Sequence, residues 1–151
     1  MLSPALFGPI DVLGEEVVAS VTLIEFVLLG LVVVNLLVRA LTHRSHVAAV
    51  RENGADGLSR SLALEVTNVL IVLGGFYYIT VHVHGGVVFT TLAIGLLVAD
   101  FFEFEARLVE ARQEMPLERP KAALFASTFV FLYIAYQSLF FLIRPLWESI
   151  V

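Results

Sequence analysis

Residues 17–41 read VVASVTLIEFVLLGLVVVNLLVRAL, and only Glu25 and Arg39 among them carry a formal charge. A helix of this length rises about 37 Å, which exceeds the roughly 30 Å hydrocarbon core of a bilayer. The apolar residues form a continuous run instead of alternating with polar ones, as they would in a strand of a membrane barrel. The stretch therefore predicts a membrane-spanning helix.

Three further apolar runs of similar kind follow, at residues 62–81, 86–102 and 122–143. Of the 151 residues, 59% are hydrophobic and 15% are charged, whereas soluble domains contain about 25% charged residues. This composition excludes a soluble globular protein. We expect an all-α, polytopic integral membrane protein, with four transmembrane helices in an antiparallel bundle and a single membrane domain over residues 1–151.

The basic residues predict the orientation. Eight of the nine Lys and Arg residues lie in or beside the connections 42–61 and 103–121, and loops rich in these residues face the cytoplasm. Both termini then lie outside the cell membrane. Residues 1–14, before the first span, suit either a short segment in the headgroup interface or a loop.

The connections differ in length. Residues 81–86 allow only a tight turn, for which Gly85 and Gly86 would supply backbone freedom, while residues 53–57 mark a turn inside the first connection. The third helix keeps a helical period beyond residue 102 and should extend into the cytoplasm as far as Pro116. Its acidic stripe, with Glu103 and Arg107 as an i,i+4 pair, predicts a solvated face. Its apolar stripe needs a partner, which is the first connection, a neighbouring copy or another subunit.

Polar residues near the cytoplasmic ends of the spans predict an inner polar clamp between three helices, because charges at membrane depth are seldom left facing lipid. Arg39 would pair with an acid on a neighbouring helix, either Glu65 or Asp100. The residues of this predicted clamp are Asn35, Arg39, Glu65, Asn68 and Asp100.

A second polar group lies near the outer ends of the spans. Glu25 falls about two turns inside the membrane boundary, at a depth similar to Tyr78 and Gln137. Its carboxyl group either forms hydrogen bonds within a packed structure or lines a path for protons or ions. The sequence leaves both interpretations open.

His82 and His84 lie in the outer turn and are candidate ligands for Cu or Zn, whose sites often use imidazole. The alternative is a polar turn without metal. Cysteine is absent, so thiolate metal sites and cysteine nucleophiles are excluded, and no other cofactor is expected.

Eight Arg against one Lys, acidic connections and the absence of cysteine give the chain a composition that resembles the small uncharacterised four-span membrane proteins of halophilic archaea. The resemblance is compositional and covers the whole chain. It implies a small membrane protein and assigns a role to no residue.

No catalytic motif occurs in the sequence, and we expect no enzyme. The net charge of −5 and the scattered basic residues argue against a nucleic-acid partner, and we expect none. We expect a non-catalytic subunit or homo-oligomeric module of a membrane assembly, whose partners are lipid and either a second copy or another membrane protein; Gly95-x-x-x-Ala99 permits close helix contact. The alternatives are an ion or proton channel that uses Glu25, and a metal-binding accessory subunit of a membrane redox complex.

Overall fold

The structure is a computed structural model that describes residues 7–151. Its four long helices are α1 (Leu23–Asn53), α2 (Leu62–Val81), α3 (Val83–Arg112) and α4 (Lys121–Ile150). Two short 3-10 helices and two strands complete it, namely η1 (Gly8–Gly14), η2 (Gly54–Gly57), β1 (Glu16–Val18) and β2 (Val21–Thr22). All four long helices are long and apolar enough to cross a membrane, which confirms the prediction of an all-α chain with four such helices.

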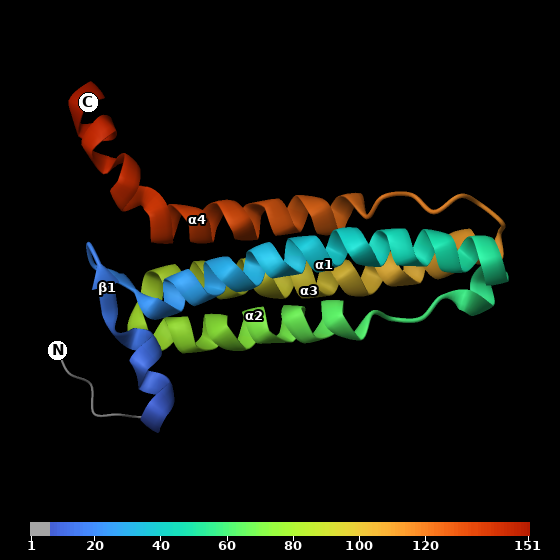
Figure 1. Ribbon diagram of the computed structural model, residues 1–151, viewed down its shortest axis with the longest axis horizontal. Helices are drawn as coiled ribbons and strands as arrows, with labels where there is room; N and C mark the ends of the chain where they lie inside the picture. Colours follow the sequence, from blue (N-terminus) through green and yellow to red (C-terminus); the bar gives the residue numbers. More distant parts are fainter. Residues whose placement is uncertain (1–6) are drawn as a thin grey trace.

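The helices lie side by side, and each runs back along the one before it (Figure 1). α1 and α3 each pack against both α2 and α4. We call the end that carries the connections 42–61 and 103–121 the inner end, and the end with η1 the outer end. The central core is fully buried and is formed by apolar side chains of all four helices, among them Ile24, Leu28, Val32, Ile71, Tyr78, Phe89, Leu96, Val130 and Ile134.

The first helix begins later than the sequence predicts, at Leu23 instead of Val17. The residues before it form an antiparallel hairpin of β1 and β2. Its turn residues, Ala19 and Ser20, both have positive φ, as a two-residue type I′ turn requires. The Ser20 amide donates to the Glu16 carboxylate at 2.9 Å. The residues that the apolar run predicts as the start of the helix therefore form a hairpin, whose turn is held by this side-chain hydrogen bond.

α1 and α3 both continue past the predicted inner ends of their spans. α1 runs through most of the first connection and ends at Asn53, where Gly54 adopts a φ of +66°, a conformation that suits glycine. α3 continues to Arg112, close to the predicted end. The His46 ring of α1 lies 5.8 Å from the Phe104 ring of α3. Of the three partners considered for the apolar stripe of α3, the structure supplies the first connection.

At the outer end, His82 is the single non-helical residue between α2 and α3. The turn is therefore tighter than expected, and Gly85 and Gly86 lie inside the first turns of α3 instead of in the turn. Their role is close approach, since a Cβ on Gly85 would lie 2.8 Å from the Tyr78 hydroxyl and one on Gly86 2.7 Å from the Tyr78 carbonyl carbon. Both distances are shorter than van der Waals contact allows.

α4 extends to Ile150, beyond the predicted end of its span at Ile143, and contains Pro145. Proline has no N–H and its ring crowds the preceding turn, which bends a helix. Figure 1 shows the C-terminal part of α4 leaving the line of the bundle. Leu146 and Trp147, just after the proline, are exposed.

Candidate functional site

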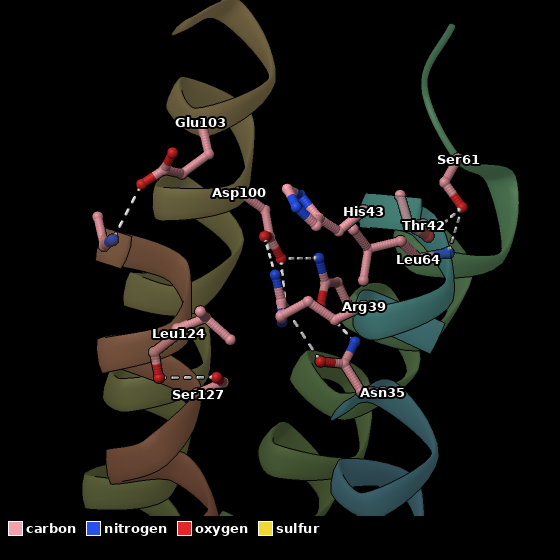
Figure 2. A network of polar contacts seen from close by, with 12 residues as sticks. Asn35, Arg39, Thr42, His43, Ser61, Leu64, Asp100, Glu103, Leu124 and Ser127 are labelled. Carbon is pink, nitrogen blue, oxygen red and sulfur yellow. Dashed lines mark hydrogen bonds and ion pairs between the residues drawn. The ribbon is translucent and has the colours of Figure 1, made fainter. Parts of the chain in front are cut away.

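An inner polar cluster joins three helices near their inner ends (Figure 2). Arg39 of α1 forms an ion pair with Asp100 of α3, with Nη2 donating to Oδ2 at 2.8 Å. Asn68 of α2 donates to the same oxygen at 2.6 Å. Asn35 of α1 donates to the Asn68 Oδ1 at 2.7 Å and accepts from Arg39 at 3.0 Å. The four side chains form a closed ring of hydrogen bonds, which we call the inner ring.

The inner ring contains four of the five residues predicted for the clamp. The fifth, Glu65, does not reach Arg39; its side chain is half exposed and lies 3.8 Å from Arg60. Thr67, which the sequence analysis did not single out, takes part instead, because its Oγ1 accepts from Asn35 at 2.8 Å. Of the two acids considered as the partner of Arg39, the structure places Asp100 there. Thr67 is uncharged and lies inside an apolar span, so its contact with Asn35 could not be predicted from the sequence.

An outer polar cluster surrounds Glu25, which is only 3% exposed. Its Oε2 accepts from the backbone N–H of Thr22 at 2.7 Å and from the Thr22 hydroxyl at 3.1 Å, so the pair forms a capping box at the start of α1. Its Oε1 accepts from the Tyr78 hydroxyl at 2.7 Å. The side-chain oxygen of Gln137 lies 3.3 Å from the same hydroxyl, and the Gln137 amide donates to Tyr133 at 3.3 Å.

The structure therefore brings together the three residues predicted as a proton or ion path, Glu25, Tyr78 and Gln137. Thr22 and Tyr133 extend the group. The three hydrogen bonds to the carboxyl group match the first interpretation offered by the sequence, an acid bonded within packed helices. They fix where α1 begins and tie it to α2.

The candidate metal ligands are separated by the helix boundary. His82 is the non-helical residue of the tip, and its ring lies 6.0 Å from the Tyr78 ring in an edge-to-face arrangement. His84 belongs to the first turn of α3, and both histidines are exposed. Within residues 7–151, no three His, Asp or Glu side chains gather closely enough to hold a metal ion.

Arg107 of α3 is buried, whereas the sequence predicts that it lies on a solvated face. It is 6% exposed, and its Nη1 and Nη2 donate to Nδ1 of His46 at 2.7 Å and to Nδ1 of His43 at 2.9 Å. Glu103, predicted to pair with it, instead accepts from the Ala122 N–H at the start of α4 at 2.9 Å (Figure 2). The prediction of a solvated face is wrong at Arg107, because the extension of α1 covers it.

His43 and His46 are both neutral, and each accepts a hydrogen bond from Arg107 through Nδ1. The Nε2 of His46 lies 2.9 Å from the Ser59 carbonyl oxygen; a carbonyl can only accept, so Nε2 carries the proton and Nδ1 is free to accept from Arg107. Burial and then the charge of Arg107 lower the pKa of His46. The same two causes, followed by the charge of Arg119, lower the pKa of His43. The neutral form is therefore favoured at this end of the bundle.

A cavity of about 260 Å³ opens beside this cluster, between the inner ends of α1, α2 and α3. Three arginines line it, Arg39, Arg60 and Arg107. The hydroxyl groups of Thr42 and Ser61, 3.1 Å apart (Figure 2), add further polar groups to the wall. Neither the sequence motifs nor the span boundaries indicated this cavity, since it depends on the helical extension of α1.

We expect the thermal stability of the protein to fall as the pH drops below about 6.5, the pKa of a free imidazole. Because His43 and His46 have lowered pKa values in the folded state, the unfolded chain takes up protons first. The stability present above that pH is then lost as the pH falls through the lowered values. The measurement is the thermal midpoint by circular dichroism in detergent, from about pH 8 to about pH 5.

The control for this pH dependence is the double variant His43→Asn with His46→Asn. An asparagine oxygen lies near the position of Nδ1, so it accepts from Arg107 without titrating. The pH profile should become flatter in this range. A profile that the double substitution leaves unchanged would assign the pH dependence to other groups.

A family model described as a domain of unknown function, DUF7313, matches residues 3–151. No curated protein and no solved structure matches the chain. The matched region covers all four long helices. The inner ring, the outer cluster and the arginine-lined cavity therefore all lie within it.

Proposed function

We propose that this chain, which belongs to the DUF7313 family, is a small four-span integral membrane protein that acts as a non-catalytic subunit or homo-oligomeric module of a membrane assembly. Its four helices are long and apolar enough to span a bilayer. Their outward faces supply the apolar surface that lipid requires. Exposed side chains on these faces include Leu37, Val66, Leu73, Phe102, Phe125 and Leu132.

In this proposal the protein is a multi-pass protein of the cell membrane, with the inner end in the cytoplasm and both termini outside. The excess of arginine at the inner end supports this orientation. The arrangement in Figure 1 is compatible with it, because η1 and the C-terminal end of α4 both lie at the outer end, on opposite sides of the bundle. The extensions of α1 and α3 then project beyond the cytoplasmic surface of the bilayer.

The observation that carries the non-catalytic role is the pairing of the polar side chains at membrane depth. Arg39 and Asp100 neutralise each other inside the inner ring, and Glu25 is held by Thr22 and Tyr78. An unpaired charge near the bilayer centre costs about 2.5–3.5 kcal/mol on insertion scales, and these contacts offset that cost. Both clusters join helices to one another, which is the task of structural polar groups.

An assembly surface is supported by the outward face of α3. Gly95 lies on this face, with nothing within 4 Å of the position of a Cβ, so it makes no close approach inside the chain. Glycine costs a helix about 1 kcal/mol relative to alanine. Thr91, one turn away, is also exposed and small. Small residues spaced by four positions let a helix of another chain pack closely.

We expect Gly95→Leu to weaken this assembly while the fold is retained, because the leucine blocks close helix approach and its Cβ has no other part of the chain within 4 Å. The measurement is native mass spectrometry after mild detergent extraction. The parent protein should show a stoichiometry above one or a co-purifying partner, and the variant should lose it. Gly30→Leu is the matched control, since Gly30 lies on the outward face of α1 with the same open space. A monomeric parent without a partner would refute the proposal.

Two alternative functions have weaker support. Conduction of protons or ions is favoured by the contacts that connect Glu25, Tyr78 and Gln137 across three helices. The single hydrogen of the Tyr78 hydroxyl is, however, already donated to Glu25, whose carboxyl group accepts two further bonds. A metal-binding accessory subunit would use Cu or Zn at His82 and His84, where the tip offers two exposed imidazoles.

A further inference from the structure

The buried guanidinium of Arg107 has no carboxylate in direct contact among residues 7–151, since no carboxylate oxygen there comes within 4.0 Å of it. Its two hydrogen-bond acceptors are the neutral histidines His43 and His46. Placing an unpaired cation in a protein interior costs several kcal/mol. An anion in direct contact with the guanidinium would lower this cost.

The carboxylates near Arg107 are already engaged elsewhere. Glu103 accepts from Ala122 at the start of α4, Glu110 accepts from the backbone N–H of Glu118, and Asp100 is paired with Arg39. Glu65, Asp100 and Glu103 line the cavity together with the three arginines, and Glu65 lies half exposed beside Arg60. None of these acids forms a direct ion pair with Arg107; Glu103, Glu110 and Asp100 act on its charge only from beyond 4.0 Å.

Two of the arginines that line the cavity each have one buried nitrogen without a hydrogen-bond partner within residues 7–151. In the part of the chain that the structure describes, Nε of Arg39 and Nε of Arg107 are buried and form no hydrogen bond, and both residues line the cavity. At its mouth, the guanidinium of Arg60 lies over the rings of Phe101 and Phe104, at 4.8 Å and 4.5 Å from their centroids, which holds it in place. Three guanidinium groups thus line one space; Arg39 is paired with Asp100 and Arg60 with Glu105, and Arg107 has no ion-pair partner within 4.0 Å among residues 7–151.

The cavity is amphipathic along the direction of the helices. Arg107 and His46 lie in the helical extensions, whereas Val69 and Leu97 line the part that is nearer the middle of the bundle. Val69 is exposed on the outward face of α2. A ligand with a charged head and an apolar chain matches both parts of this lining.

We propose that this cavity binds a phosphoryl anion, presented by the headgroup of an anionic phospholipid in the cytoplasmic leaflet. Guanidinium groups offer forked donors that match the geometry of phosphate oxygens. Basic pockets between transmembrane helices on the cytoplasmic side suit anionic headgroups. The cavity is far larger than the roughly 10–15 Å³ that one water needs. The inference rests on the membrane placement proposed above and is independent of the assembly surface on α3.

The test measures lipid binding to the full chain in detergent by native mass spectrometry. Phosphatidylglycerol should bind more tightly than phosphatidylcholine, whose choline group offsets the phosphate charge. Arg107→Gln should weaken phosphatidylglycerol binding by about tenfold or more, because a charge-assisted hydrogen bond is lost. Arg112→Gln is the matched control, since Arg112 is an exposed arginine in the last turn of the same helix. This variant should bind phosphatidylglycerol as tightly as the parent protein does.

Arg60→Gln keeps the test informative if Arg107→Gln does not fold, because Arg60 lies at the partly exposed mouth; it should also weaken binding of phosphatidylglycerol. A separate titration with inorganic phosphate distinguishes the source of the anion. If inorganic phosphate binds while phosphatidylglycerol does not, and phosphate binding is lost in the Arg107 or Arg60 variant, the result would support a phosphoryl site and reject the lipid as its ligand. Equal affinity for the two lipids without phosphate binding, or unchanged binding in the arginine variants, would overturn the proposal. Extraction of membranes with alkaline carbonate tests the membrane placement separately.

Discussion

Asp100→Asn should lower the free energy of unfolding by about 3–5 kcal/mol, the cost of breaking a buried ion pair by removing one partner. Arg39 is 3% exposed and would keep its charge without compensation. The asparagine amide would also direct a donor at Asn68, which now donates to Asp100. The loss should appear as a shift of the unfolding transition, followed by circular dichroism while a mild detergent is replaced by a denaturing one.

Glu105→Gln is the matched control for this prediction. It removes one carboxylate from an ion pair of the same helix, the contact with Arg60 at 2.8 Å, in which the Glu105 side chain is half exposed. Exposed ion pairs contribute about 0–1 kcal/mol. Similar losses in the two variants would show that the inner ring does not hold a buried pair.

Gly86→Ala should destabilise the protein by about 1–3 kcal/mol or more through overpacking. A Cβ at this position would meet the backbone of Ile79 and the carbonyl carbon of Tyr78. Backbone atoms cannot move aside as a flexible side chain can, so α2 and α3 would have to separate at the outer end. Separation would also loosen the contact between Tyr78 and Glu25.

The control is Gly30→Ala, at a helical glycine with nothing within 4 Å of the new Cβ. Alanine is the better helix former by about 1 kcal/mol, so this variant should be as stable as the parent or more stable. Thermal midpoints of both variants in the same detergent provide the measurement. If the two variants changed stability equally, close packing at Gly86 would be disproved.

The four helices follow from the apolar runs because a continuous run long enough to span a bilayer favours a helix. The start of the first helix was missed because Val17, Val18 and Val21 continue the apolar run without interruption. The sequence does contain the signal for the true start, since Thr22 and Glu25 have the spacing of a capping box. The hairpin turn at Ala19 and Ser20 carries none of the glycine or asparagine that marks such turns.

The inner ring could be predicted because a charge inside an apolar span needs a partner. The choice between Glu65 and Asp100 depends on which side of α2 packs against α1. The sequence of α2 is almost entirely apolar and does not indicate that side. Arg107 was assigned to solvent for a related reason. Arg107 is buried because α1 continues as a helix through a polar connection. The buried side of a polar helix cannot be identified from its own sequence unless the helix that packs on it is known.

The single residue between α2 and α3 favours early pairing of these two helices. A connection as short as His82 makes the entropy of loop closure small, and contacts between neighbouring segments form faster than distant ones. We therefore expect these two helices to pair first as one hairpin, in register through the close approach of Gly75 and Thr90. α1 and α4 are joined to this hairpin by longer connections, and we expect them to pack onto it afterwards.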